Sequence, residues 1–513
     1  MKIERTKNTI RNTKWGVSQK IVSILCPFFL RTALIYVLGA EYAGLSSLFT
    51  SILSILSLTE LGFSNAIVYN MYKPVAEDDE DKICALLNIY RRAYLIIGWV
   101  ILALGVILIP VLPYLISGDV PADTNLYILY LVYLINTVIS YFLFGYKMAI
   151  LSAYQREDVI SKNTLLYNVI LYGLQFVVLF AFRNYYAYAI IIPLATVFLN
   201  LLNNRAVKKM FPNYKPAGEI DSDTKANLKK SILGIMIWKV GAATRNTLDS
   251  IVISMYLGLV AVAMYNNYFY IINGVITFLG VIITSITAGV GNKVATESPE
   301  NNYKDFHKFH FYYMWISGWC AVCMMCLYQP FMSLWMGEKM MFPDYIMFMF
   351  CYYFIMLKQG DINYVYYQAT GLWWEGKMRS IIETVLNLIL NLILGKYFGV
   401  AGIIAATIIS FTCIYFYGSK FVFTKYFKNG RLMSFYVDNC IYLGTIAGAG
   451  IITFIITKAI TNAIDFNIIG ESSIVLILCV LIPNIIFAVV YSVGKQQRCY
   501  IRGVYNKLLR KSN

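Results

Sequence analysis

Charged residues are scarce in this sequence. Only 14% of its 513 residues are Asp, Glu, Lys or Arg, whereas 59% are hydrophobic. Soluble globular domains carry about a quarter charged residues, so this composition excludes a chain built from soluble domains. No stretch alternates polar and apolar residues with a period of two, which excludes a membrane β-barrel. The chain is therefore predicted to lie in a lipid bilayer as helices.

Motifs for covalent chemistry are missing too. No GxxxxGK[ST] loop occurs, which argues against ATP hydrolysis. His307 and His310 are the two histidines, at the start of a predicted helix, where we favour an interfacial role over a proton relay. Cys320, Cys323 and Cys326 lack a fourth ligand and have helical spacing, so we favour apolar packing over a metal site. We expect no enzyme activity, no cofactor and no metal.

What the sequence does contain is long apolar runs, each able to cross about 30 Å of hydrocarbon as a helix. They predict an all-α polytopic membrane protein with about fourteen transmembrane helices. The predicted spans are 14–38, 43–72, 83–116, 125–150, 159–182, 186–210, 229–257, 261–292, 308–336, 343–371, 378–396, 400–424, 434–460 and 473–494.

Positive charge fixes the predicted orientation. With the N-terminus taken as cytoplasmic, alternate loops and the two chain ends collect 35 of the 43 Lys and Arg residues. Four lie in the opposite loops: Arg183, Lys339, Lys396 and Lys458. Short cytoplasmic loops are enriched in Lys and Arg, so both termini are predicted to be cytoplasmic. The formal charge of +16 is explained by this topology, and we expect no nucleic-acid partner.

An internal repeat is indicated by matched positions in the two halves. Leu38–Gly39 recurs as Leu257–Gly258, Lys20 as Lys239, and Asn168 as Asn387, each 219 residues apart. Six crossings return the chain to the cytoplasm, so two six-helix lobes related by a parallel repeat are predicted, with two extra C-terminal helices. Chance matching of apolar sequence is the alternative explanation for these pairs.

The predicted domains follow from this repeat. An N-lobe covers 1–210, a polar cytoplasmic linker 211–230 and a C-lobe 231–430. Helices thirteen and fourteen occupy 431–495, and a basic cytoplasmic tail covers 496–513. Two lobes related in this way are expected to enclose a cleft near the middle of the bilayer, where transporter sites generally lie.

Ionisable residues at membrane depth are the candidate functional residues, because an ion at the centre of a spanning helix costs roughly 2.5–3.5 kcal/mol. Apart from the cations already counted with the loops, we assign nine ionisable residues to the interior of the predicted spans: Arg31, Glu60, Lys239, Arg245, Asp249, Lys358, Asp361, Glu383 and Asp438. Glu383 and Asp438 lie near predicted cytoplasmic ends, where a side chain can reach water, so they are set aside.

Two of the candidate pairs have a structural alternative. Arg245 and Asp249 are four residues apart and Lys358 and Asp361 three apart, so each pair can form a local ion pair without any ligand. Arg31 and Lys239 have no obvious acidic partner on their own helices. Glu60 can satisfy one of them, whereas a cavity with surplus positive charge suits an anionic substrate. The sequence leaves both interpretations open.

A family resemblance adds to this picture. The stretch from Arg31 through "LGAEYAGLSSLFTSILSILSLTELGFSNAI" to Ile67, and the echo "YLGLVAVAMYNNYFYIINGV" from Tyr256, resemble the two lobe starts of polysaccharide-transporter (Wzx-type) flippases. These flippases belong to the multidrug/oligosaccharidyl-lipid/polysaccharide (MOP) exporter superfamily, which also contains the MATE drug exporters.

The resemblance implies a function and a site. It implies a flippase of the bacterial cytoplasmic membrane that moves undecaprenyl-diphosphate-linked oligosaccharide repeat units across the bilayer by alternating access, for surface polysaccharide assembly. It also implies a cationic cavity in which the diphosphate binds Arg31, Lys239, Arg245 and Lys358. Glu60, Asp249 and Asp361 are then the expected counter-charges, or sites for a coupling proton or sodium ion. Polysaccharide polymerase machinery is an expected partner.

Two rival functions are weighed against it. A MATE-like cation-coupled drug antiporter shares the twelve-helix plan but should carry a mainly acidic cavity. A membrane glycan polymerase or ligase usually needs an extensive outer loop, and the longest predicted outer loop is about a dozen residues near 461–472. The surplus of cations at membrane depth favours the flippase over both.

Overall fold

The computed structural model describes residues 5–60, 63–118, 120–220, 222–372, 377–428, 431–463 and 468–512. The backbone of 226–246 is helical, but its side chains lie outside the description. Throughout this part of the chain the regular structure is helical and no strand occurs, so the all-α prediction is confirmed. The chain divides into two compact units, Met1–Asn266 and Asn267–Asn513, which are described one at a time.

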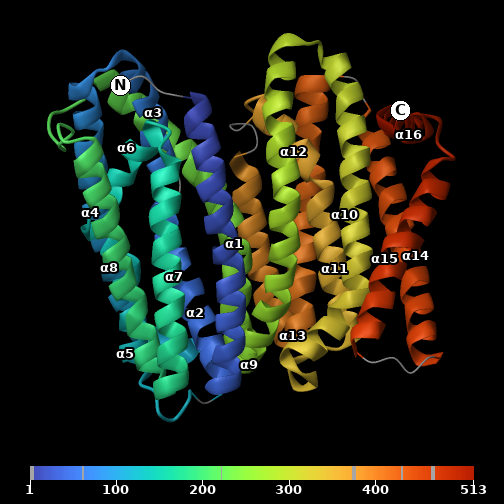
Figure 1. Cartoon of the computed structure of the whole chain (residues 1–513), viewed down its shortest axis with the longest axis horizontal. Helices are drawn as coiled ribbons and strands as arrows, with labels where there is room; N and C mark the ends of the chain where they lie inside the picture. The colour runs from blue at the N-terminus through green and yellow to red at the C-terminus, as the bar shows by residue number, and fades with distance from the viewer. Residues whose placement is uncertain are drawn as a thin grey trace. The chain divides into compact units, whose positions relative to one another are not determined.

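The first unit is a bundle of long helices joined by short breaks (Figure 1). Helix α1 packs on α7, α7 on α8, α8 on α5, and α5 on α4. In chain order the elements are α1 (Arg5–Val37), α2 (Ala40–Leu56), η1 (Ser57–Glu60), α3 (Phe63–Glu77), α4 (Glu80–Leu108), η2 (Ile109–Leu115), α5 (Leu126–Phe142), η3 (Gly145–Lys147), α6 (Met148–Ala153), α7 (Glu157–Phe182), α8 (Tyr185–Met210) and the first part of α9 (Ser222–Thr296).

The second unit is a further helical bundle in which α10 is central, because it packs on α11, α14 and α15. Its elements after the end of α9 are α10 (Pro299–Met336), η4 (Glu338–Met340), α11 (Asp344–Gln359), α12 (Asp361–Ala369), α13 (Lys377–Phe421), η5 (Val422–Phe427), α14 (Leu432–Ala463), α15 (Ile468–Tyr491) and α16 (Lys495–Ser512). Aromatic rings fill the core beside α10, where Phe306 contacts Tyr366, Phe423 and Phe435.

Polar side chains start several helices. Asp79 accepts a hydrogen bond from the backbone N–H of Lys82 at the start of α4, and Asn184 accepts one from Ala187 at the start of α8. Such caps satisfy backbone donors that have no partner inside the helix. Each cap therefore fixes the residue at which its helix begins.

Three glycines separate consecutive helices. Gly39 has φ 123° between α1 and α2, while Gly258 (φ 81°) and Gly399 (φ 59°) interrupt α9 and α13. Residues that carry a side chain rarely adopt a positive φ, whereas glycine adopts it readily. A glycine at each of these positions therefore allows one helix to end and the next to begin. Gly39 and Gly258 are the matched glycines of the predicted repeat, and both lie at such a break. Gly258 and Gly399 also fall in the gaps between predicted spans.

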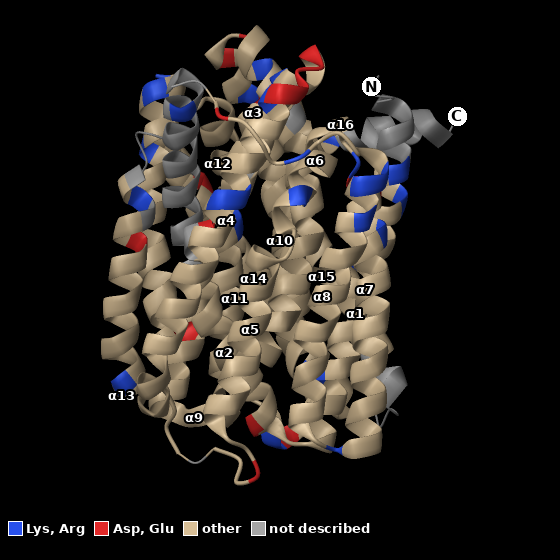
Figure 2. Ribbon diagram, turned by 90° about the vertical axis from the view of Figure 1, so that its left-hand side faces the viewer, with Lys and Arg blue, Asp and Glu red and all other residues tan. Residues whose placement is uncertain are grey.

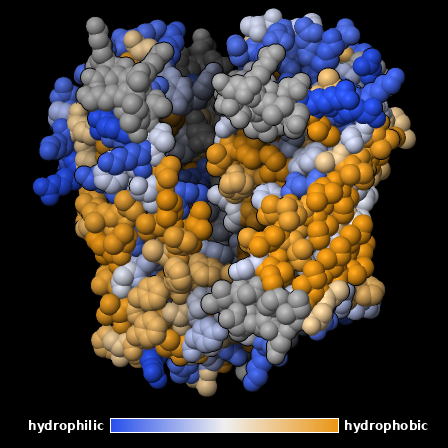
Figure 3. Space-filling model, turned by 45° about the vertical axis from the view of Figure 1, so that its right-hand side comes forward, coloured by the Kyte–Doolittle hydropathy of each residue, from blue (hydrophilic) through white to orange (hydrophobic). Residues whose placement is uncertain are grey.

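The helix surfaces fit a bilayer. Figure 2 shows Lys, Arg, Asp and Glu gathered near the ends of the helices, and Figure 3 shows a band of hydrophobic side chains between hydrophilic ends. Ile455 on α14 is 61% exposed and Ile485 on α15 60% exposed. Large apolar side chains exposed in a continuous band indicate contact with lipid rather than water.

Nine helices within the described residues are long and apolar enough to cross a membrane, or ten if a bent pair is one span. That pair is Leu126–Phe142 with Gly145–Ala153, bent by 50°. Two of the nine, Thr247–Thr296 and Ile381–Phe427, contain the breaks at Gly258 and Gly399. The protein is thus a multi-pass membrane protein, while the total of about fourteen spans stays a prediction.

Candidate functional site

Glu60 is the candidate carboxylate of the first unit, at the end of η1. The hydroxyl of Tyr94 on α4 donates to its Oε1 at 2.6 Å, and the hydroxyl of Tyr141 on α5 donates to its Oε2 at 2.5 Å. Glu60 forms no ion pair with any side chain that the structure describes. The carboxylate is therefore held by neutral donors, one to each oxygen.

A chain of hydroxyls leads to this carboxylate. Tyr90 donates to the hydroxyl of Tyr94 at 2.7 Å, and Tyr94 in turn donates to Glu60. The rings of Tyr94 and Tyr141 are edge to face, with centroids 5.1 Å apart. Tyr90, Tyr94 and Tyr141 are 1%, 7% and 6% exposed, so tight packing fixes the positions of their hydroxyls. We name these three tyrosines with Glu60 the Glu60 cage.

Arg31 lies on α1, where its guanidinium donates to the Ser47 hydroxyl of α2 at 3.3 Å and to the Ala263 carbonyl of α9 at 3.2 Å. These two contacts orient the guanidinium. Asp249 is 1% exposed on α9 and accepts a hydrogen bond from the hydroxyl of Tyr265 at 2.8 Å. In the first unit, polar contacts thus hold one predicted cation, Arg31, and one predicted anion, Asp249, in place.

Lys239 and Arg245, the other two predicted cations of the first unit, lie outside the residues whose side chains are described. Their backbone belongs to α9. Their predicted contact with a diphosphate, and the predicted ion pair between Arg245 and Asp249, stay predictions.

Lys358 and Asp361 belong to the second unit, on either side of the junction between α11 and α12 at Gly360. The ammonium of Lys358 lies 2.7 Å from Oδ2 of Asp361, and the Tyr313 hydroxyl of α10 donates to the same oxygen. The side chain of Lys358 is 6% exposed and that of Asp361 27%. Of the two interpretations that the spacing allowed, the structure shows the local ion pair.

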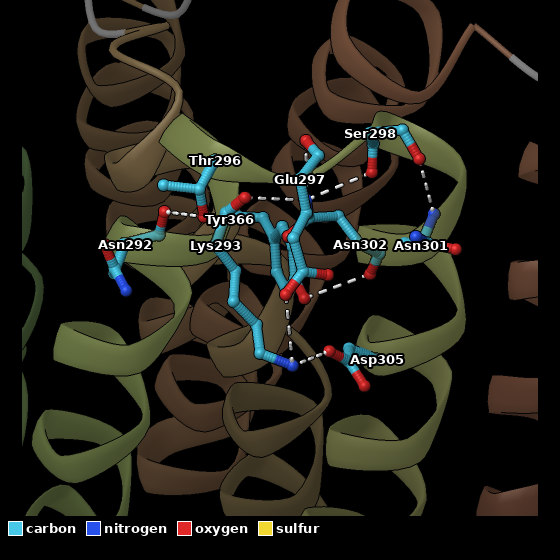
Figure 4. A network of polar contacts seen from close by, with 9 residues as sticks. All are labelled: Asn292, Lys293, Thr296, Glu297, Ser298, Asn301, Asn302, Asp305 and Tyr366. Atoms are coloured by element: carbon cyan, nitrogen blue, oxygen red, sulfur yellow. Dashed lines mark hydrogen bonds and ion pairs between the residues drawn. The ribbon is translucent and has the colours of Figure 1, made fainter.

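A second polar network joins α9 to α10 (Figure 4). The fully buried amide of Asn302 donates to the carbonyl of Lys293 at 3.1 Å and also reaches those of Glu297 and Ser298. Lys293 forms ion pairs with Asp305 and, at 4.0 Å, with Glu297. These contacts connect the end of α9 to the start of α10, so the network stabilises the corner between the two helices.

Several buried polar residues were not among the functional candidates that the sequence predicted. Tyr90, Tyr94 and Tyr141 come from two helices, and nothing in their spacing distinguishes them from the other tyrosines. Glu383, set aside as able to reach water, is 5% exposed in α13. The only sign of this burial in the sequence was that Glu383 lies one helical turn or more inside a predicted span, and that sign is weak.

The fold and these sites define a class: a multi-pass helical membrane protein with ionisable residues fixed within its bundles. Solved structures share this architecture. An inward-facing multidrug resistance MATE family transporter of the MOP superfamily matches with a TM-score of 0.61 and 14% identity, covering 82% of this chain and 98% of that chain. The lipid II flippase MurJ in an inward closed conformation matches with a TM-score of 0.68 and 13% identity, covering 94% and 98%.

An outward-facing MATE transporter matches as well, with a TM-score of 0.54 and 15% identity, covering 84% of this chain and 96% of that chain. The chain therefore has the fold of MOP-superfamily transporters. At such identities the likeness concerns the fold alone. No family model and no curated protein matches the sequence.

Proposed function

We propose that this protein is a flippase that moves an undecaprenyl-diphosphate-linked oligosaccharide across the bacterial cytoplasmic membrane by alternating access, for surface polysaccharide assembly. The observation that carries the proposal is the fold, shared over 94% of this chain with a lipid II flippase. The basic residues at membrane depth fit this substrate class, because guanidinium and ammonium groups bind phosphate. Both termini face the cytoplasm in this proposal, and no covalent chemistry is performed.

The diphosphate binds Arg31, Lys239 and Arg245 in this proposal. Arg31 suits the role because its contacts to Ser47 and Ala263 fix the direction of a guanidinium group, which binds phosphate with two parallel hydrogen bonds. Lys358 is bound to Asp361, so it contributes to phosphate binding only when that 2.7 Å ion pair opens. The polyprenyl tail stays in the lipid, and polysaccharide polymerase machinery receives the product.

The Glu60 cage supplies a site for a coupling proton. Two phenol donors stabilise the charged carboxylate, and no described cation stabilises it further. A bound proton gives the carboxyl group one O–H donor and fewer acceptor sites, so its hydrogen bonds with Tyr94 and Tyr141 must rearrange. A sodium ion fits less well, since both carboxylate oxygens already accept O–H donors. Asp249 and Asp361 are the alternative sites for a coupling ion.

The decisive experiment measures flipping of a fluorescent undecaprenyl-diphosphate oligosaccharide in proteoliposomes. Arg31→Ala should lower the rate at least about tenfold, because one charge-assisted contact to phosphate contributes about 1.5–3 kcal/mol. Arg92→Ala is the matched control, since Arg92 is an exposed arginine on α4. Flipping at the wild-type rate in Arg31→Ala would remove Arg31 from the mechanism.

The MATE-like drug antiporter is the second candidate, because two MATE structures share the fold at TM-scores of 0.61 and 0.54. The same proteoliposomes distinguish the two functions. Export of cationic dyes without movement of the lipid-linked oligosaccharide would favour the antiporter and contradict the flippase.

A further inference from the structure

A pocket of about 400 Å³ opens in the first unit, separate from the Arg31 and Asp249 contacts. Its wall combines Arg91 and Leu95 of α4, Phe142 and Phe144 at the end of α5, and Lys215 of the segment after α8. Positive charge and apolar surface thus meet in one cavity.

The break after α5 builds one side of this pocket. Phe144 has φ 50°, in the left-handed region, and the chain bends by 50° between α5 and the helix that follows. A Cβ on Gly145 would lie 2.4 Å from the carbonyl oxygen of Ser140, so only glycine fits there. The bend turns Phe142 and Phe144 into the wall of the pocket.

The segment after α8 builds the opposite side and is bound to α4. The backbone N–H of Ala217 donates to the carbonyl of Cys84 at 3.4 Å, and the amide of Asn88 donates to the carbonyl of Gly218 at 2.9 Å. These bonds hold Lys215 over the same face of α4 that carries Arg91. The two cations of the pocket are therefore brought together by tertiary contacts, although they are far apart in the sequence.

Several basic side chains gather in and around this pocket. Lys147 lies close by, with its ammonium 2.6 Å from the Asn204 side-chain oxygen, and Arg91 and Lys208 are near enough to act on its charge. Among the residues that the structure describes, none of Arg91, Lys147, Lys208 and Lys215 takes part in an ion pair.

The nearest acidic residues lie outside the lining of the pocket. Glu60 is one of them, and it accepts a hydrogen bond from Tyr141, which belongs to the lining. Glu80 and Asp81 at the start of α4 are about ten residues from Arg91, roughly 15 Å along the helix. Glu219 follows Lys215 in the same segment, and within the described part of the chain it forms no ion pair either. Among the described residues, the lining itself thus contains two cations, Arg91 and Lys215, and no acidic residue.

We propose that this pocket binds the phosphate headgroup of an anionic phospholipid from the cytoplasmic leaflet. Arg91 offers a planar fork for two phosphate oxygens and Lys215 a point charge, while Leu95, Phe142 and Phe144 contact the glycerol end of the lipid. Basic pockets between helices at the cytoplasmic surface bind such headgroups, and the Lys and Arg distribution places this one on that side. The assignment does not depend on which substrate is transported.

The test uses the full-length purified protein in detergent and counts bound lipid by native mass spectrometry. Phosphatidylglycerol, phosphatidylcholine and inorganic phosphate are the three probes. The double variant Arg91→Gln with Lys215→Gln should bind phosphatidylglycerol at least about tenfold more weakly than the wild type, because each cation near a headgroup contributes about 1 kcal/mol.

The matched control is Arg92→Gln with Lys209→Gln, exposed cations of α4 and α8 that do not line the pocket. It should change binding less than about twofold. Unchanged phosphatidylglycerol binding in the Arg91 and Lys215 double variant would overturn the proposal, as would equal binding of phosphatidylcholine and phosphatidylglycerol to the wild type. Inorganic phosphate that competes as strongly as the lipid would make this a free-phosphate site and overturn the lipid assignment. Thermal melting of both double variants confirms that each is folded.

Discussion

Tyr141 joins two sites of the first unit. Its hydroxyl donates to Oε2 of Glu60 at 2.5 Å, while its ring forms part of the wall of the pocket that contains Arg91. A ligand in that pocket therefore contacts the residue that holds the carboxylate. Because both contacts belong to one buried side chain, a shift of the ring alters the hydrogen bond to Glu60.

The Glu60 cage predicts how the pH dependence of transport responds to substitution. Glu60→Gln keeps the size of the side chain but cannot bind a coupling proton, so transport driven by a pH gradient should fall at least about tenfold and lose its pH dependence. Tyr141→Phe removes one of the two donors to this carboxylate, so the pH profile of transport should differ from that of the wild type.

The control for that series is Tyr130→Phe. Tyr130 is also fully buried, but its hydroxyl donates to the carbonyl of Gly105 and not to Glu60. Tyr130→Phe should leave the midpoint of the pH profile of transport unchanged, even if it lowers the stability of the protein. A pH profile that is the same in Glu60→Gln and in the wild type would show that the coupling proton binds elsewhere.

The ion pair between Lys358 and Asp361 predicts an asymmetric effect on stability. Asp361→Asn leaves the ammonium of Lys358 buried without its partner, which should cost about 2 kcal/mol. This lies below the roughly 3–5 kcal/mol of a fully buried pair because Asp361 is 27% exposed. Replacing both residues, as Lys358→Met with Asp361→Leu, should recover much of the loss.

Thermal unfolding of the purified protein measures both variants. The single variant should melt at a lower temperature than the double variant. If the two melt together with the wild type, the ion pair contributes nothing to stability and Lys358 is available to bind other groups.

Gly44 predicts a packing requirement between α2 and α9. A Cβ at this position would lie 2.0 Å from the carbonyl oxygen of Leu259, a backbone atom that cannot turn aside. Gly44→Ala should destabilise the protein by roughly 1–3 kcal/mol despite the better helix propensity of alanine. Gly173→Ala on α7 is the control, because no atom lies within 4 Å of its added Cβ, and it should melt at or above the wild-type temperature.

The charge of the proposed substrate predicts an effect of membrane potential. Moving two negative charges outward across an inside-negative membrane is favourable by roughly 4–5 kcal/mol per 100 mV if the charges of the protein return uncompensated. Flipping in proteoliposomes should therefore accelerate when an inside-negative potential is imposed with potassium and valinomycin. A rate that ignores the potential would indicate that the transport cycle is electrically neutral.

Some features of the structure could be predicted from the sequence. The all-α class follows from apolar runs of membrane length, and the matched glycines of the predicted repeat, Gly39 and Gly258, both have positive φ. The local pair of Lys358 and Asp361 was one of two outcomes that helical spacing allowed. The helical class and the Lys358–Asp361 pair depend on composition or on residues within about one turn of a helix, and the glycine match depends on a repeat along the sequence.

Tertiary structure decided the rest. Two sites join segments that lie 34 to over 100 residues apart in the sequence. They are the hydrogen bonds of Glu60 to Tyr94 and Tyr141, and the pocket that contains Arg91 and Lys215. Apolar periodicity tells which residues avoid water, but it does not say which helices become neighbours, since many helix pairings bury similar apolar faces. The sequence by itself determined that the chain is a helical membrane protein with ionisable groups at depth. The packing of the helices determined which donors and charges those groups meet.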